Sequence, residues 1–414
     1  MYFEKNPDGQ VYPASTTKIM TALLALEHTD DFLQQVTCSD AVADIDYTST
    51  VLGVKPGEIL PLQELLYGLM LPSGNDCAMA IAVFVSGSVS DFVELMNKRA
   101  KELGMLNTGY TNPHGLHNTA HYTTARDMAI LTREAMKLEA FREIVGSSKH
   151  TFPATNKSDR MTKYNSNYLI NPEKEQFFYP GCNGVKTGYT SNSGGCLIAS
   201  SLRNDTEFIA LIFGDDQNLG KWSTATTMFN FGYSNYTTLE ITGRLSTAPI
   251  LTTIKNAARD DLLSGELQLT HADCDPIFIT GKNAEMAAYE LQLKDVQMEF
   301  SPALDTLRAP IESGQVLGQV RYTLDGEELW TSSLVASRSI TERRGIFQPL
   351  INFTSNLRVP LWGLPPLQYY SAIIGIICII GLLVIGLGML RKRRQKQSAR
   401  RVTYNLKPKP RKKL

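Results

Sequence analysis

Apolar residues recur at helical spacing through roughly the first third of the chain. The stretches TTKIMTALLALE, DFVELMNKRAKELGM and TTARDMAILTREAMKLEAF place apolar side chains three or four positions apart, as amphipathic helices do. Ser and Thr precede the first of these stretches, and both residue types are favoured as helix caps. The pattern predicts a mainly helical region from residue 15 to about residue 145.

From about residue 183 the period shortens to that of strands. The runs NGVKTGYT, GGCLIASSL and EFIALIFG are separated by Ser, Asn and Gly turn signals, which predicts three neighbouring antiparallel strands. WSTATTMFNFGY then returns to helical spacing. This order predicts an α+β domain over residues 1–238, with helices packed on an antiparallel sheet.

The pattern changes again between residues 239 and 340. The short alternating runs LQLTH, PIFITG, QVLGQVRYTLDG and LWTSSLVAS are separated by turn residues. They predict a small β-sandwich as a second domain. We expect residues 341–368 to form a stalk after it.

Residues 371–390, SAIIGIICIIGLLVIGLGML, contain no charged side chain. At about 1.5 Å per residue, this run spans the roughly 30 Å hydrocarbon core of a bilayer. Aromatic residues precede it and RKRRQK follows it, so the positive-inside rule predicts a transmembrane helix over 369–390, a cytoplasmic tail over 391–414 and an extracytoplasmic body. The alternative, a buried core helix, is disfavoured by these flanks.

Charge is unevenly distributed along the chain. The formal net charge is zero, but residues 391–414 hold twelve of the 41 Lys and Arg and none of the 41 Asp and Glu. The body is therefore acidic, and we expect no nucleic-acid partner. An exported body needs a signal peptide, and MYFEKNPDGQ has neither a basic nor an apolar region of that kind. We expect that a signal precedes the sequence given.

The six cysteines show no CxxC or Cys/His metal spacing, so we expect no zinc site. Cys182 and Cys196 flank a predicted turn and could pair, although two free buried thiols are the favoured interpretation. NPHGLHNTAHYTT holds three histidines, but their spacing is loose and no acidic cluster is near. We therefore expect no metal ligands there, and expect Asn112 and Gly115 to shape the loop.

Ser15 and Lys18 stand three residues apart at the start of an apolar helix, where their side chains can meet. A serine hydroxyl needs a neighbouring base, and burial in an apolar environment can lower a lysine pKa far enough to provide one. Free backbone N–H groups at the helix start would stabilise an oxyanion. Alone, the S-x-x-K pattern is also common by chance.

LPSGNDCAMAIA places Ser73 and Asn75 just before a predicted helix. As an ordinary loop it would supply a helix cap. As part of a site, Ser73 would pass a proton between lysine and leaving group, and Asn75 would hold Lys18 and a substrate amide.

GVKTGYT places Lys186, Thr187 and Gly188 on a predicted strand. The ordinary alternative is a solvated lysine at a strand end. In a site, Lys186 and Thr187 would present a cation and a hydroxyl to a substrate carboxylate, while Gly188 would leave room for it. The backbone N–H of Tyr189 would then join that of Ser15 as an oxyanion hole.

S-x-x-K, S-x-N and K-T-G in this order are the signature of penicillin-binding proteins and serine β-lactamases. The chain resembles the low-molecular-mass penicillin-binding proteins that act as D-alanyl-D-alanine carboxypeptidases. The resemblance is carried by YPASTTKIMTALLALE, VKPGEILPLQELLYGLMLPSGNDCAMAIA, TNPHGLHNTAHYTTARDMAIL and APIESGQVLGQVRYTLDGEEL, and covers about residues 2–340.

The resemblance implies that Ser15 attacks the penultimate carbonyl of a peptidoglycan stem peptide ending in D-Ala-D-Ala. D-Alanine leaves, water hydrolyses the acyl-enzyme, and β-lactams acylate the same serine. It also implies no cofactor, and a carboxylate contact from a basic residue at the position of Lys221, where the family commonly has Arg. A first strand before the serine helix is expected to precede this sequence, and the full transmembrane span departs from the amphipathic anchor of most relatives.

Two alternatives are a serine β-lactamase and a non-catalytic β-lactam receptor. Class A β-lactamases need a glutamate for deacylation, and no convincing equivalent lies between the S-x-N and K-T-G motifs. The short basic tail contains no output domain that a receptor would use. Both observations favour the carboxypeptidase.

Overall fold

The computed structural model describes most of the chain before residue 344 and a few residues beyond it. The described residues are 2–45, 49–217, 219–245, 249–272, 275–343, 379–385 and 387. Most of the predicted stalk, transmembrane span and basic tail lies outside them. Within the described ranges no single helix is long and apolar enough to cross a membrane. One pair of helices, Asn75–Ser86 and Val89–Glu102, reaches that length and apolar character only when the two are taken together, and they are bent by 83° relative to each other.

The first part of the chain is mainly helical, as predicted. Its helices are η1 (Ala14–Thr17), α1 (Lys18–His28), η2 (Asp40–Ala43), α2 (Leu62–Met70), α3 (Asn75–Ser86), α4 (Val89–Glu102), α5 (Ala125–Ala135) and α6 (Glu139–Gly146). Two antiparallel pairs lie among them, β1 (Gln35–Thr37) with β2 (Ile59–Pro61), and β3 (Lys149–Phe152) with β4 (Met161–Tyr164). The single stretch TTARDMAILTREAMKLEAF forms parts of two helices, because α5 ends before α6 begins.

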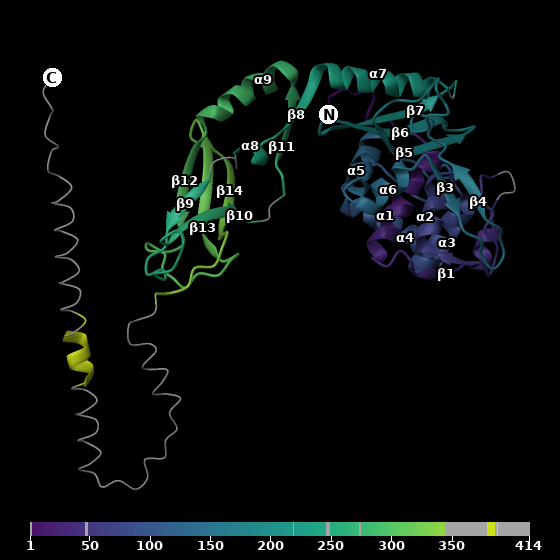
Figure 1. The fold of residues 1–414 in the computed structure, drawn as a ribbon. Coiled ribbons are helices and arrows are strands. Elements are labelled where there is room, and N and C mark those ends of the chain that lie inside the picture. Colours follow the sequence, from purple (N-terminus) through teal and green to yellow (C-terminus); the bar gives the residue numbers. More distant parts are fainter. Residues whose placement is uncertain are drawn as a thin grey trace, which may run out of the picture. The chain divides into compact units, whose positions relative to one another are not determined.

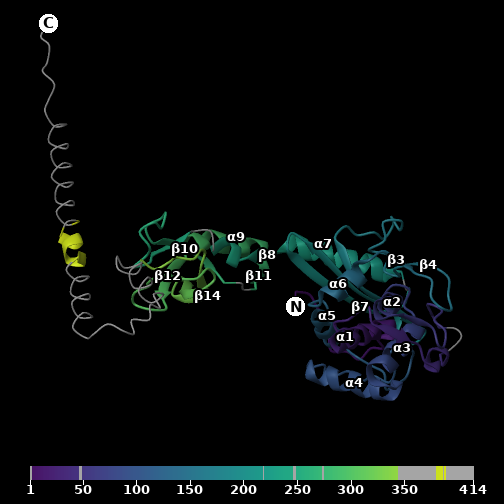
Figure 2. The same cartoon turned by 60° about the horizontal axis from the view of Figure 1, so that its bottom comes forward.

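The three predicted strands form one antiparallel sheet. They are β5 (Cys182–Thr190), β6 (Gly194–Arg203) and β7 (Thr206–Asp215), paired in that order. The predicted helix after them is α7 (Gly220–Asn235), which covers one face of the sheet while the N-terminal helices cover the other (Figures 1 and 2). Alternation along β6 sends Leu197 into the core under α7 and Ile198 into the core of the N-terminal helices.

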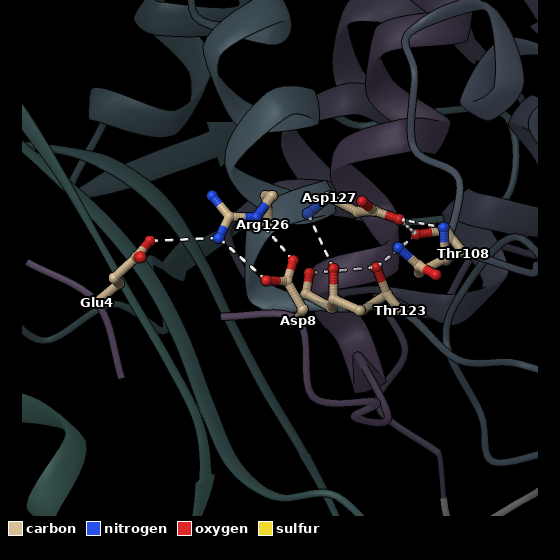
Figure 3. Close-up of polar contacts among 8 residues, drawn as sticks. Glu4, Asp8, Thr108, Thr123, Arg126 and Asp127 are labelled. Carbon is tan, nitrogen blue, oxygen red and sulfur yellow. Dashed lines mark hydrogen bonds and ion pairs between the residues drawn. The ribbon is translucent and has the colours of Figure 1, made fainter. Parts of the chain in front are cut away.

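The segment that leads to η1 is held against the start of α5. Arg126 donates from Nε to Asp8 at 2.7 Å and from one terminal nitrogen to Asp8 at 3.0 Å and Glu4 at 3.3 Å (Figure 3). Val11 and Thr123 also exchange backbone hydrogen bonds of 2.8 and 2.9 Å. These contacts fix the approach of the chain to the turn at residues 14–17.

A β-rich domain follows α7. β8 (Tyr236–Glu240) pairs with β11 (Phe278–Lys282), and a five-stranded sheet has the order β12-β13-β14-β10-β9. The members of that sheet are β9 (Ile250–Thr253), β10 (Glu266–His271), β12 (Gln297–Pro302), β13 (Val316–Leu324) and β14 (Glu327–Ala336). The four strand runs predicted here are confirmed.

The sequence pattern did not predict the short helices in the β-rich domain. They are α8 (Thr242–Leu245), α9 (Asn283–Gln292) and η3 (Leu293–Asp295). Only Met286 of α9 is buried, so the helix carries too narrow an apolar stripe to be recognised by period.

Candidate active site

Ser15 and Lys18 meet as predicted, but on a different local structure. Ser15 lies in the 3₁₀ turn η1, and Lys18 is the first residue of α1. In a 3₁₀ turn, residues three apart are nearly eclipsed, which brings the two side chains together. The distance from Lys18 Nζ to Ser15 Oγ is 3.1 Å.

The turn that carries Ser15 is held from both sides. Ala14 has a φ of +47°, and Thr17 donates from Oγ1 to the Ala14 carbonyl at 2.8 Å instead of capping α1. Nδ1 of His121 accepts a backbone N–H, so Nε2 carries the proton and donates to Thr17 Oγ1 at 2.8 Å. Gly115 is required next to this turn, because a Cβ there would lie 1.9 Å from the Ala14 oxygen.

Lys18 is fully buried, and its amine has three partners. Nζ lies 2.7 Å from Asn75 Oδ1, 2.8 Å from the His114 carbonyl oxygen and 3.1 Å from Ser15 Oγ. A neutral amine has two N–H groups and one lone pair. The two carbonyl-type oxygens can accept both N–H groups, which leaves the lone pair for the hydroxyl of Ser15.

Burial also favours the neutral amine. Loss of solvation lowers the Lys18 pKa well below its ordinary value, and the charge of nearby Lys186 lowers it further. Burial lowers the pKa of Lys186 itself to about 7. Lys18 can therefore act as a proton acceptor close to neutral pH.

The S-x-N segment is held in a strained conformation beside Lys18. Ser73 has a φ of +72°, a region that residues other than glycine adopt at a cost of about 1–3 kcal/mol. Its Oγ is buried and makes no hydrogen bond within the described residues. Asn75 begins α3, and the next residue, Asp76, accepts three backbone N–H groups from residues 52–54 at 2.7–3.0 Å.

β5 brings the K-T-G residues to the serine turn. Lys186 is 1% exposed, whereas Tyr189 is 57% exposed. A Cβ on Gly188 would lie 3.1 Å from the backbone nitrogen of Ser15. Glycine at 188 therefore allows β5 to lie closely against the serine turn.

Ser166 is a site residue that the sequence did not single out. Its Oγ lies 2.7 Å from Oγ1 of Thr187, and its backbone N–H donates to the Leu71 carbonyl at 3.0 Å, two residues before Ser73. Ser166 thus links the K-T-G strand to the segment that carries S-x-N. A lone serine between two motifs gives no local signal for this role.

Lys221 lies in the first turn of α7 and is 5% exposed. Its backbone N–H donates to Asp215 Oδ2 at 2.8 Å, and its ammonium lies 5.2 Å from the ring centroid of Trp222. Burial raises the pKa of the Cys196 thiol to about 11, and the charge of Lys221 partly offsets that rise. Cys196 is the β6 residue that pairs with Gly188. Its role toward a substrate carboxylate stays a prediction.

The histidine-rich loop packs around the serine turn. His114 and His121 are buried, and burial lowers their pKa values to about 3 and about 4, so both are neutral near pH 7. The ring of His117 packs edge-on against the ring of Tyr12. Asn112 shapes the loop as predicted, accepting the Gly115 N–H at 2.7 Å.

Neither metal-binding clusters nor disulfides are found in the part of the chain that the structure describes. No group of three His, Cys, Asp or Glu residues there could hold a metal ion. Cys182 and Cys196 are free thiols, and Cys196 is buried whereas Cys182 is only half-buried, not fully buried as expected.

Both domains of the chain match known protein families. Residues 1–217 match the family described as D-alanyl-D-alanine carboxypeptidase, and residues 278–342 match the C-terminal domain of penicillin-binding protein 5. D-alanyl-D-alanine carboxypeptidase DacF of Bacillus subtilis is 34% identical over 345 residues, covering 82% of each chain. DacA of Haemophilus influenzae is 30% identical over 363 residues, covering 83% of each.

Solved structures agree with these matches. Penicillin-binding protein 5 from Haemophilus influenzae is 27% identical, with a TM-score of 0.54 over 82% of this chain and 94% of that one. The Streptomyces K15 DD-transpeptidase is 30% identical, with a TM-score of 0.52 over 56% of this chain and 91% of that one. The similarity to the carboxypeptidase relatives therefore extends through both domains.

Proposed function

Because this chain belongs to the D-alanyl-D-alanine carboxypeptidase family of serine-type, penicillin-binding enzymes, we propose that Ser15 is its nucleophile and Lys18 its general base. The observation that carries this assignment is the fully buried Lys18 amine, which has two carbonyl-type acceptors and the Ser15 hydroxyl as neighbours. The activity is the removal of a terminal D-alanine from peptides ending in D-Ala-D-Ala, and we propose peptidoglycan stem pentapeptides as the natural substrate.

The proposed acylation step uses the groups gathered around Ser15. Neutral Lys18 takes the proton of Ser15 while Oγ attacks the penultimate carbonyl, and the N–H groups of Ser15 and Tyr189 receive the developing oxyanion. The proton then passes through Ser73 to the nitrogen of the departing D-alanine. The unpartnered buried hydroxyl of Ser73 supports this role. Water then cleaves the Ser15 ester by the reverse proton path, with Asn75 holding the substrate amide and Lys18.

The substrate carboxylate is bound by the K-T-G strand. Lys186 supplies the cation and Thr187 the hydroxyl, which Ser166 orients through its 2.7 Å hydrogen bond. Lys221 adds positive charge close to the β6 residue that pairs with Gly188. A β-lactam carries a carboxylate in a similar place, so the same groups would orient it toward Ser15.

Release of D-alanine from a peptide ending in D-Ala-D-Ala tests this function together with the role of Lys186. We expect wild type to release D-alanine, and Lys186→Gln to lose about tenfold to a hundredfold in kcat/KM, the worth of one charge-assisted hydrogen bond. A peptide with an amidated C-terminus should lose much less. Because the Lys186 charge lowers the Lys18 pKa, the acid limb of kcat/KM should also move to higher pH in this variant.

Exposed Lys101→Gln is the matched control, since it removes one lysine charge from the surface of α4. Equal losses with the free and amidated peptides would contradict carboxylate binding by Lys186. No release from wild type would contradict the carboxypeptidase assignment itself.

We further propose that residues 369–390 span the membrane, with the catalytic body outside and the basic tail in the cytoplasm. The support is the uncharged run at 371–390 and the basic residues that follow it at once. Expressed in a bacterial host behind an export signal, the full chain should stay with the membrane pellet after an alkaline carbonate wash. External protease should remove the body and spare the tail. Release into the wash would contradict the span.

A further inference from the structure

One end of the β-rich domain is formed by loops from distant parts of the chain. We call residues 254–257, 261–265 and 303–315 the loop tip. They belong to the β9–β10 connection (254–265) and the β12–β13 connection (303–315), at the end of the five-stranded sheet opposite α9 (Figure 1). The N–H of Lys255 donates to the Leu307 carbonyl at 2.9 Å, which joins the two loops.

Several large apolar side chains at this end are exposed among the residues that the structure describes. Leu262 is 98% exposed and its neighbour Leu263 is 58% exposed. Leu304 in the second loop is 66% exposed, and Val316 at the start of β13 is 55% exposed. Single exposed apolar residues are ordinary, but such a group at one end of a domain marks an interaction surface.

The turn that presents the two leucines is held rigidly. Arg338 donates to both oxygens of Asp261, at 2.6 and 3.1 Å, and the Gly265 N–H donates to the same carboxylate at 2.7 Å. Ser264 and Gly265 both have positive φ, +55° and +87°, which closes the turn tightly. These hydrogen bonds fix the backbone that carries the two leucines, so little conformational entropy is lost when the leucines bind.

The chain itself indicates what this surface meets. Ile340 pairs with Ile311 of the loop tip, so the described domain ends at the same end of the sheet, close to Thr341. The sequence then continues to the uncharged run at 371–390. The loop tip therefore lies at the end of the domain from which the chain continues toward the proposed membrane span.

Charge does not point to another partner. The β9–β10 and β12–β13 connections together with residues 337–341 hold four basic and four acidic side chains, Lys255, Arg259, Arg308, Arg338, Asp260, Asp261, Asp305 and Glu312. This balance provides neither a basic surface for anionic partners nor an acidic one for cations. Apolar contact is the remaining attraction, and it suits the boundary between headgroups and acyl chains.

We propose that the loop tip inserts Leu262 and Leu263 into the membrane interface, as a second contact beside the membrane span. This proposal rests on the membrane anchoring proposed above. It assigns a lipid-binding role to the β-rich domain, and it predicts that neutral phosphatidylcholine suffices and that salt has little effect.

The test uses the full chain reconstituted in phosphatidylcholine vesicles. Leu262→Cys, in a background with Cys274→Ser and Cys378→Ser, is labelled with an environment-sensitive fluorophore. The native cysteines within the described residues are buried or half-buried. The background protein without the Leu262→Cys change, treated with the same fluorophore, gives the background signal. We expect a blue-shifted emission that spin-labelled phosphatidylcholine quenches. Salt at 0.5 M should leave the emission unchanged, although it screens surface charges over a distance of about a few ångströms.

The matched control is Leu106→Cys, because Leu106 is also a highly exposed leucine, at 81%, and lies in the catalytic domain. Its label should show water-like emission without quenching. Identical signals at 262 and 106 in vesicles that carry the protein would overturn the proposal. A shift at 262 that grows with the protein-to-lipid ratio would mean contact with a second copy and would also overturn it.

Flotation and D-alanine release are measured on the same vesicles. A failure of the loop-tip proposal can then be distinguished from a failure of the membrane anchor or of the carboxypeptidase activity. Protein that does not float with the vesicles would overturn both the anchor and the inserted tip. D-Alanine release would still report the carboxypeptidase activity in that case. Protein that floats, is active and shows a water-like label at 262 would overturn the tip proposal alone.

Discussion

Replacing Ser15 by Ala should abolish D-alanine release while the fold is kept. The substitution removes only the attacking oxygen, and the turn that carries it is held by Thr17, His121 and Gly115. Loss of a covalent nucleophile typically costs about 10⁴-fold or more in turnover. Steady-state release of D-alanine measures the loss, and labelling by a fluorescent penicillin should disappear with it.

Ser90→Ala on the exposed face of α4 is the matched control and should retain wild-type activity and labelling. Thermal unfolding should place both variants within about 1 kcal/mol of wild type, because neither change creates a cavity in the core. D-Alanine release that persists in Ser15→Ala would assign the nucleophile to another residue.

Replacing Lys18 by Met should nearly abolish acylation even though Ser15 is present. Met keeps the length and apolar stem of the side chain but supplies no base, and loss of a general base costs about 10²–10⁴-fold. The rate of penicillin labelling in single-turnover conditions measures acylation directly. The acid limb of kcat/KM, which we attribute to protonation of Lys18, should be absent from the residual activity.

Lys18→Arg separates the base from the charge. Arginine keeps a cation at this place but is not deprotonated in proteins, so it cannot accept the Ser15 proton. We expect both variants to keep only residual activity. Lys18→Met should also lose stability, because the Asn75 and His114 oxygens are left without their buried donor. Substantial activity in Lys18→Arg would show that Lys18 acts through its charge instead of as a base.

Much of the fold could be predicted because its elements carry strong local periods. The N-terminal helices, strands β5–β7 and α7 all follow from apolar spacing and turn residues. α9 was missed because it buries a single residue, Met286. The break between α5 and α6 was missed because apolar spacing continues across it.

The residues of the site could be predicted, but the contacts that hold them in place could not. Ser15 and Lys18 were placed together from their spacing alone, although the turn is 3₁₀ and the expected cap is absent. Three supporting contacts come from residues distant in sequence: Ser166 on Thr187, His121 on Thr17, and the His114 carbonyl on Lys18. A backbone carbonyl or a lone serine has no sequence signature.

By itself, the sequence determined the order of the elements and the identity of the chemical groups, since hydrophobic period and the three short motifs are local properties of a chain. Tertiary structure decided whether those groups can act. It buried Lys18 and placed Lys186 near it, which lowers the Lys18 pKa, and it set Gly188 against the backbone of Ser15. Burial and proximity depend on residues far apart in the chain, and therefore appear only once it is folded.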